Sequence, residues 1–265
     1  MSRIAKMFKE LKGKKEKALI AYITAGDPDI ATNGQLLKCL VESGADMIEL
    51  GVPFSDPMAD GPTILEASQR ALAHPFSIAA ILDLIREFRR YSDVPLILFG
   101  YYNPLLQYGL EKLARDASQA GADGFLVVDL PPEEATELKK AADSHQLDTI
   151  FLLAPTSTDE RIKKVAAMAS GFVYYVSITG VTGARESLAE MMDESVGKIR
   201  KFTDLPVGIG FGVSSPGHVR EICGFADAVI VGSAIIKQVE ANAGKPDMLA
   251  KVGSFVQELK KATLI

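Results

Sequence analysis

The 265-residue sequence has only three histidines and two cysteines, and no run of apolar residues reaches the length of a membrane span. The histidines His74, His145 and His218 do not pair at ligand spacing, and none follows a predicted strand, so a zinc site is not expected. Cys39 and Cys223 lie far apart in apolar helical patterns. This predicts two buried free thiols and fits a reducing cytoplasm, with no disulfide framework.

Charge and missing motifs exclude further classes of protein. The net charge of -5 and the pI near 5.4 argue against a nucleic-acid surface, and the only basic cluster, residues 12–17, lacks interleaved aromatics. No Walker or dinucleotide-binding pattern is present, and no serine lies in a nucleophile elbow. Lysines are nearly absent from the predicted strand ends, so a Schiff-base aldolase has no evident nucleophile. Carboxylates are therefore the best acid/base candidates.

Short apolar runs rich in Ile, Val, Leu and Phe alternate with amphipathic helical stretches along the chain. The predicted strands are Leu19–Thr24, Met47–Leu50, Leu96–Tyr101, Phe125–Val128, Thr149–Leu153, Phe172–Val176, Val207–Gly210 and Ala228–Val231. The predicted helical stretches are Gln35–Val41, Ser77–Arg89, Leu110–Ala120, Glu133–Ala142, Arg161–Met168, Val196–Phe202, Val219–Ile222 and Leu249–Leu259. This alternation indicates parallel pairing through right-handed crossovers, the pattern of an α/β protein.

Eight such units without a linker predict one domain over residues 1–265, a closed (β/α)₈ TIM barrel. An open doubly wound sheet is the alternative, but it needs an edge, and no weakened edge strand is found. Before the first strand, Ile4, Met7, Phe8 and Leu11 recur at helical spacing with charges between them. That spacing predicts an extra N-terminal amphipathic helix rather than a signal peptide.

Glu49 interrupts an apolar run that is otherwise typical of an interior parallel strand. An ionised carboxylate costs several kcal/mol to bury without partners, so a strand keeps one where chemistry needs it. Asp56 and Asp60 follow within one loop, at the carboxyl end of the strand where α/β proteins build their sites. The alternatives are an edge strand that exposes Glu49, a helix-capping or loop role for Asp60, and a solvated loop position for Asp56, which is favoured there.

The last two strand exits combine glycines with the start of a helix. Gly212 lies just before one predicted helix, and Gly232 and Ser233 open another. Glycine lets backbone N–H groups approach an anion, and a helix N-terminus favours negative charge, so these exits predict a phosphate site. Tight turns and caps explain each glycine alone. Gly183 and Thr182, in the preceding loop, lie where they could close over the same ligand.

With these motifs the chain resembles the alpha subunit of tryptophan synthase along essentially its whole length. The carrying segment is Glu-Leu-Gly-Val-Pro-Phe-Ser-Asp-Pro over residues 49–57, followed by Ala-Asp-Gly-Pro-Thr-Ile over residues 59–64. Further motifs lie in matching order at 26–28, 102–104, 129–131, 180–183 and 210–212. The resemblance implies retro-aldol cleavage of indole-3-glycerol phosphate to indole and glyceraldehyde 3-phosphate, with no metal or organic cofactor in this chain.

The resemblance also assigns roles to single residues. Glu49 is the expected acid/base group, and Asp60 is the carboxylate that stabilises positive charge on the indole nitrogen. The expected substrate-binding residues are Tyr22, Ile64, Tyr102, Leu126, Leu152, Tyr174, Thr182 and Val231. The expected phosphate ligands are Gly183, Gly212, Gly232 and Ser233. For the tyrosines, structural core positions are the alternative.

By the same resemblance, the partner is a pyridoxal-phosphate beta subunit in an alpha2beta2 heterotetramer, and the cofactor belongs to that partner. The loop around Pro53, Asp56 and Pro57 is expected to face it, in the cytoplasm. Two departures leave the pocket's size open: Tyr22 stands where family members often carry phenylalanine, and Gly100 replaces a larger residue.

Three other functions compete with this interpretation. One is another phosphate-binding barrel, such as an indole-glycerol-phosphate synthase, which would be expected to need a lysine at a strand exit. A second is a stand-alone lyase that releases indole without a partner. The third is a catalytically silent, phosphate-sensing regulatory subunit, against which the intact pair Glu49 and Asp60 argues.

Overall fold

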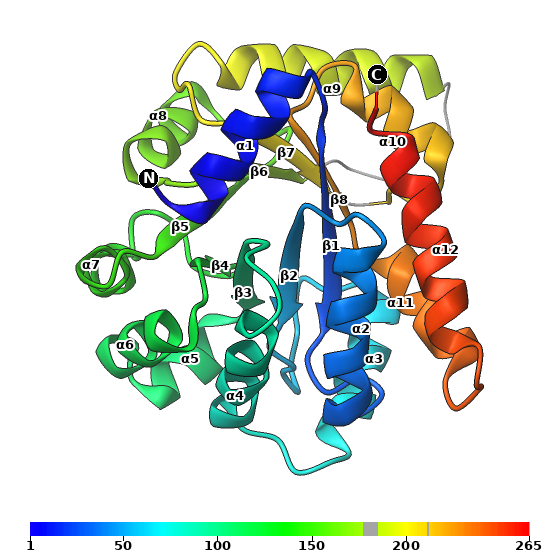
Figure 1. The fold of residues 1–265 in the computed structure, drawn as a ribbon. Coiled ribbons are helices and arrows are strands. Elements are labelled where there is room, and N and C mark those ends of the chain that lie inside the picture. The colour runs from blue at the N-terminus through cyan, green and yellow to red at the C-terminus, as the bar shows by residue number, and fades with distance from the viewer. Residues whose placement is uncertain (177–184, 211, 265) are drawn as a thin grey trace.

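The computed structural model describes residues 1–176, 185–210 and 212–264, and in this part of the chain eight strands form a closed parallel barrel (Figure 1). The strands are β1 (Ala18–Thr24), β2 (Met47–Gly51), β3 (Leu96–Gly100), β4 (Gly124–Val127), β5 (Asp148–Leu153), β6 (Val173–Val176), β7 (Val207–Gly210) and β8 (Ala228–Val231). They pair in chain order, and β8 returns to β1. The predicted TIM barrel is confirmed, and the open sheet is excluded.

Helices surround the barrel. In the described residues they are α1 (Arg3–Lys14), α2 (Ile30–Glu42), α3 (Pro62–Leu72), α4 (Ile78–Arg89), α5 (Tyr102–Tyr108), α6 (Leu110–Ala120), α7 (Thr136–Ser144), α8 (Asp159–Met168), α9 (Arg185–Ile199), α10 (Pro216–Cys223), α11 (Ser233–Asn242) and α12 (Met248–Lys261). Two of them, α3 and the short α5, were not predicted. The helix predicted from Val196 begins at Arg185, because the first ten residues of α9 are mostly polar and carry little apolar spacing.

Residues alternate along each strand between the barrel interior and the layer beneath the helices. The interior cluster includes Ile20, Met47, Ile97 and Leu126. The amphipathic face of α1 belongs to the same cluster, and its Phe8 ring lies 6.0 Å from the ring of Phe172. Helix α1 therefore closes one end of the barrel with apolar side chains (Figure 1). That leaves the carboxyl ends of the strands as the open mouth.

The two cysteines are free, and no described helix is long and apolar enough to cross a membrane. Cys223 is buried as predicted. Cys39 is only half-buried, which differs from the prediction, and its thiol donates to the carbonyl of Leu249 at 3.1 Å.

Candidate active site

Glu49 points into the barrel. It lies on β2 between Met47 and Gly51 and is in register with Tyr22 of β1 and Ile97 of β3. Its side chain is 1% exposed, and its Oε1 atom has no hydrogen-bond partner among the described residues. Burial raises the pKa of the Glu49 carboxyl to about 8. The edge-strand alternative is thereby excluded, and the group is poised between its acid and base forms near neutral pH.

A second buried carboxylate shows how differently this chain treats a structural charge. Asp123, 6% exposed, accepts hydrogen bonds from the guanidinium groups of Arg3 at 3.0 Å and Arg89 at 2.5 Å. It also accepts from the backbone N–H of Leu96 at 2.8 Å. A buried charge is normally held in this way. The Oε1 atom of Glu49 has no such partner, and its pKa is strongly raised by burial, which together mark a candidate functional site.

Asp60 lies in the loop between β2 and α3, and Tyr101 holds it. Burial raises the pKa of the Asp60 carboxyl to about 6, against the lowering effect of a hydrogen bond from the Tyr101 hydroxyl. The same hydroxyl accepts the backbone N–H of Ala59 at 2.9 Å. Tyr101 itself is 3% exposed and precedes the first turn of α5. One buried hydroxyl therefore fixes both the carboxylate and the backbone before it.

Two tyrosines complete the wall around the carboxyl groups. Burial raises the pKa of Tyr22, and the charges of both Asp60 and Glu49 add to the rise. Burial and the charge of Glu49 act in the same direction on the pKa of Tyr174. Both hydroxyls therefore stay protonated at neutral pH, and Tyr22 lies within electrostatic range of both carboxyl groups. Its ring meets that of Phe99 edge-on, at 5.1 Å between centroids.

Glycines on the neighbouring strands make room for these rings. A Cβ atom at Gly51 would overlap the hydroxyl of Tyr22, and one at Gly210 would overlap the hydroxyl of Tyr174. Since a hydroxyl held against a strand backbone leaves no space for a side chain there, only glycine fits at either position. Close packing of each hydroxyl against the backbone of a neighbouring strand thereby fixes the positions of the two tyrosine rings.

Some predicted pocket residues lie inside the barrel, and others pack outward. Leu126, Leu152 and Tyr174 belong to the interior cluster. Val231 packs outward beneath the helices, and its neighbour Ile230 faces the interior instead. Half-buried Ile64, on α3, packs against the outer layer.

Tyr102, which was predicted to bind the substrate, also differs from its neighbour Tyr101 in the direction it packs. Tyr102 packs with the outer layer, and its backbone N–H donates to Asp129 at 2.7 Å. Tyr101, which sequence reasoning did not single out, is the residue at Asp60. Beside it, Val52 lies 3.2 Å from where a Cβ of Gly100 would be, so the space that this glycine leaves is largely filled.

At the predicted phosphate site, α11 and α10 begin differently. Gly232 precedes α11, Ser233 is its first residue, and no described side chain caps its N-terminal N–H groups. Helix α10 is capped by its own Ser215, whose hydroxyl accepts the N–H of His218 at 3.3 Å. Gly212 has a φ of 75°, which favours glycine. The α11 terminus therefore remains open to an anion. Thr182 and Gly183 lie outside the described residues.

The predicted partner loop is only partly accessible. Pro53 is buried at the end of β2, so it supports the loop from below and is not exposed to a partner. Asp56 is exposed, with its Oδ2 atom 2.5 Å from the Ser55 hydroxyl, and Pro57 is half-buried. Met58 was missed, although it is 96% exposed. An unbranched apolar side chain held in water is typical of a contact surface.

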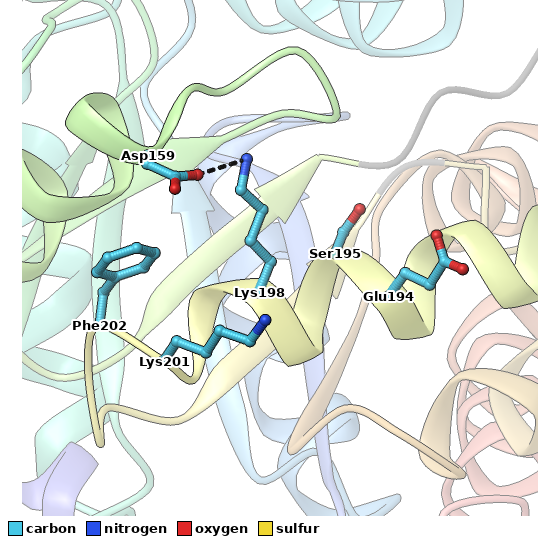
Figure 2. Close-up of a pocket in the computed structure, with 6 residues that line it drawn as sticks. All are labelled: Asp159, Glu194, Ser195, Lys198, Lys201 and Phe202. Atoms are coloured by element: carbon cyan, nitrogen blue, oxygen red, sulfur yellow. Dashed lines mark ion pairs between the residues drawn. The ribbon is translucent and has the colours of Figure 1, made fainter.

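A surface hollow of about 390 Å³ lies between α8 and α9 (Figure 2). Its lining residues are Asp159, Glu194, Ser195, Lys198, Lys201 and Phe202. The Lys198 ammonium pairs with Asp159 at 2.9 Å. Since neither Glu49 nor Asp60 lines it, and its charged groups are solvated, the barrel mouth is the better candidate site. The described residues contain no cluster of three or more metal-ligating side chains.

Comparisons with known proteins agree on one family. Residues 8–264 match the family model described as tryptophan synthase alpha chain. The tryptophan synthase alpha chain of Geobacter sulfurreducens is 54% identical over 262 residues, covering 99% of each chain. That of Geotalea uraniireducens is 53% identical over 260 residues, covering 98% of this chain and 97% of the relative.

Solved structures agree as well. The crystal structure of tryptophan synthase subunit alpha from Legionella pneumophila superposes with a TM-score of 0.92 at 40% identity, covering 99% of this chain and 98% of that one. A chain in a structure of Mycobacterium tuberculosis tryptophan synthase gives 0.91 at 37% identity, covering 100% and 99%.

The burial of Glu49 predicts a specific pH dependence of stability. Its pKa in the folded chain, about 8, lies above its ordinary value of 4.5, so folding favours the protonated form. This contribution is complete below the ordinary pKa and is lost as the pH rises through the folded pKa. Glu49→Gln, which is neutral at every pH, should lack that loss.

The measurement is urea unfolding of parent and variant between about pH 5 and pH 9. We expect the free energy of unfolding of the parent to fall relative to the variant by up to several kcal/mol, since each pKa unit corresponds to about 1.4 kcal/mol. Parallel curves over the whole range would contradict the raised pKa.

Proposed function

The chain belongs to the tryptophan synthase alpha chain family, whose alpha subunit cleaves indole-3-glycerol phosphate in tryptophan biosynthesis, and from this premise we propose how the barrel mouth performs the cleavage. Glu49 is the general acid/base, and Asp60 is the carboxylate that faces the indole nitrogen. The single observation that carries this assignment is the burial of the Glu49 carboxyl on an interior strand, with no hydrogen-bond partner for its Oε1 atom among the described residues.

The reaction is a retro-aldol cleavage that needs two proton transfers. Protonation of indole carbon 3 leaves a positive charge on the ring nitrogen. Removal of the proton from the side-chain hydroxyl then forms the aldehyde, breaks the bond to carbon 3 and returns the electron pair to the ring. A carboxyl group with a pKa of about 8 can give a proton in the first step and take one in the second.

Asp60 stabilises the intermediate cation. Its pKa of about 6 leaves it ionised at neutral pH, and its hydrogen bond with Tyr101 keeps the charge in place. A fixed carboxylate opposite a charge that develops during the reaction lowers the barrier more than it stabilises the neutral substrate. Tyr22, Tyr174 and Leu126 form the apolar surround that weakens competition from water.

The phosphate of the substrate binds at the other side of the mouth. Residues 210–215 and 232–233 include no lysine or arginine, so backbone N–H groups and the α11 dipole must hold the anion. Gly212, Gly232 and Ser233 are the described residues proposed for this role. Gly183 and Thr182 remain predicted ligands from the preceding loop.

The chain has an enzymatic role in tryptophan synthesis. We propose that it acts as a lyase without a metal or organic cofactor of its own, since both transfers are within reach of carboxyl groups. We further propose a single domain over residues 1–265 and a cytoplasmic location. The closed barrel, with α1 packed into its interior cluster, supports the single domain.

The proposed partner is a pyridoxal-phosphate beta subunit in an alpha2beta2 heterotetramer. Exposed Asp56 and Met58 support a docking role for the loop that leads to Asp60. Because Ala59 and Asp60 are tied to Tyr101, a partner that orders this loop would also fix the carboxylate. Activation by the partner is limited by its preference for the ordered loop.

Glu49→Gln should abolish turnover without unfolding the chain, because an amide of the same size cannot transfer a proton. Loss of a general acid/base group costs about 10²–10⁴ in rate, and a group that serves two transfers should cost at least that. Asp60→Asn should also be severely impaired. The measurement is indole release, with circular dichroism to verify folding. Near-parental release by folded Glu49→Gln would assign the chemistry to another group.

Ser233→Asp tests the anion site. A carboxylate at the first turn of α11 is favourable for the helix but repels a phosphate dianion, so stability should be kept while affinity is lost. We expect the KM for indole-3-glycerol phosphate to rise at least about tenfold, the size of effect that a 1.4 kcal/mol loss produces. Ser233→Asn, similar in size and uncharged, is the matched control. Equal KM values for the two variants would place the phosphate elsewhere.

Asp56→Ala and Met58→Ala test the partner. Both side chains are exposed, so the isolated chain should keep its rate of indole release. Activation in a titration with the beta subunit should be weakened. Met191→Ala, which removes an exposed methionine from α9, is the control and should be activated like the parent. If the parent itself is not activated by its cognate partner at any concentration, the chain is a stand-alone lyase.

A further inference from the structure

Arg70 of α3 makes a two-pronged ion pair with a fully buried carboxylate. Its Nε atom lies 2.8 Å from Oδ1 of Asp27, and its Nη2 atom lies 3.0 Å from Oδ2. Asp27 follows β1 and is 1% exposed. Two parallel N–H···O bonds fix the plane of the guanidinium as well as its distance, which a lysine ammonium cannot do.

The remaining arm of the guanidinium reaches a third element. The Nη1 atom of Arg70 donates to Oε1 of Glu240 on α11 at 2.9 Å. Helices α3 and α11 lie side by side next to β1 (Figure 1). Arg70 therefore joins the β1 exit, α3 and α11 through one rigid, planar group.

The β1 exit is itself held firmly. Asn33, fully buried on α2, donates through its amide to the carbonyl of Thr24 at 2.9 Å and to the carbonyl of Asp27 at 3.2 Å. Asp27 is thus fixed to the end of the strand that carries Tyr22. Through Asp27, Arg70 is anchored to the barrel wall rather than to a loose loop.

Two of the three joined elements lead to the two ends of the proposed substrate site, and the third, β1, carries Tyr22 between them. Helix α3 begins at Pro62, two residues after Asp60, and α11 begins at Ser233. Building on the function proposed above, we infer that Arg70 is a positioning residue that fixes the span between Asp60, which faces the indole end, and the phosphate site. It touches neither end of the substrate and acts through the segments that do.

A fixed span matters for a ligand that must engage both ends at once. The substrate joins an indole ring to a phosphate through a short chain, so binding at one end makes binding at the other intramolecular. That advantage depends on the distance between the two subsites, and an error of about 1 Å can cost up to about 10²-fold. A ligand that occupies one end alone is insensitive to the span.

The experiment compares the whole substrate with its two ends. Arg70→Lys keeps a cation near Asp27 but loses the planar fork, and Glu240→Gln removes only the charge on α11. The probes are indole-3-glycerol phosphate, by KM and kcat, and glycerol 3-phosphate and indole, each by its dissociation constant. Arg90→Gln, which breaks an exposed pair with Glu87 on α4, is the matched control.

For Arg70→Lys we expect the KM of the whole substrate to rise at least about tenfold. The dissociation constants of glycerol 3-phosphate and indole should change less than about twofold. Glu240→Gln should show the same pattern with a smaller change, and it decides the matter if Arg70→Lys does not fold. Arg90→Gln should match the parent in all three assays.

Two results would overturn the inference. Equal weakening of the whole substrate and of both fragments would mean that Arg70 only supports the fold. An unchanged KM in folded Arg70→Lys, or in Glu240→Gln if the former does not fold, would mean that the span does not depend on it. Failure of the parent to bind glycerol 3-phosphate, or binding unaffected by Ser233→Asp, would instead overturn the proposed phosphate site and this inference with it.

Discussion

The proposed chemistry depends on the desolvation of one carboxyl group, that of Glu49. A carboxyl group in water is ionised at neutral pH, but burial in an apolar barrel raises its pKa and favours the protonated form. Apolar groups at both ends of the barrel desolvate Glu49. Helix α1 fills one end with apolar side chains, and aromatic rings pack at the other. Gly51 and Gly210 admit the tyrosines that complete the wall.

The chain separates the roles of its charges accordingly. Structural carboxylates such as Asp123 and Asp27 are buried with arginine partners, which hold segments together. The proposed chemistry uses carboxyl groups held mainly by a low-dielectric environment and by one tyrosine hydroxyl. The proposed phosphate site uses helix dipole and backbone rather than lysine or arginine. A basic side chain there would lie across the same mouth and would favour the ionised form of Glu49.

The sequence predicted the eight strands, the closed barrel and the importance of Glu49 and Asp60, because these depend on periodicity and on a charge in an apolar run. It did not predict which face of a strand looks inward. In a parallel barrel both faces are buried and apolar, so alternation gives no direction. Hence the sequence did not show that Ile230 rather than Val231 faces the interior, or that Tyr101 rather than Tyr102 meets Asp60. The substrate-binding roles of Val231 and Tyr102 stay predictions.

Contacts between distant segments were equally invisible. Nothing near Arg70 in the sequence indicates Asp27 or Glu240 as partners, and only the closure of the barrel brings α3 and α11 together. The polar first half of α9 lacks the apolar spacing that reveals other helices. Such features arise from packing geometry, which composition and periodicity do not encode.

The most direct test of this account is the ionisation of Glu49 itself, observed by pH-difference infrared spectroscopy on the folded parent and on Glu49→Gln. The account predicts a buried carboxylic acid band that disappears as the pH passes through about 8 and that is absent from the variant. A Glu49 carboxyl that already ionises near its ordinary value of 4.5 would contradict the account, because a group ionised throughout the neutral range could not donate the first proton.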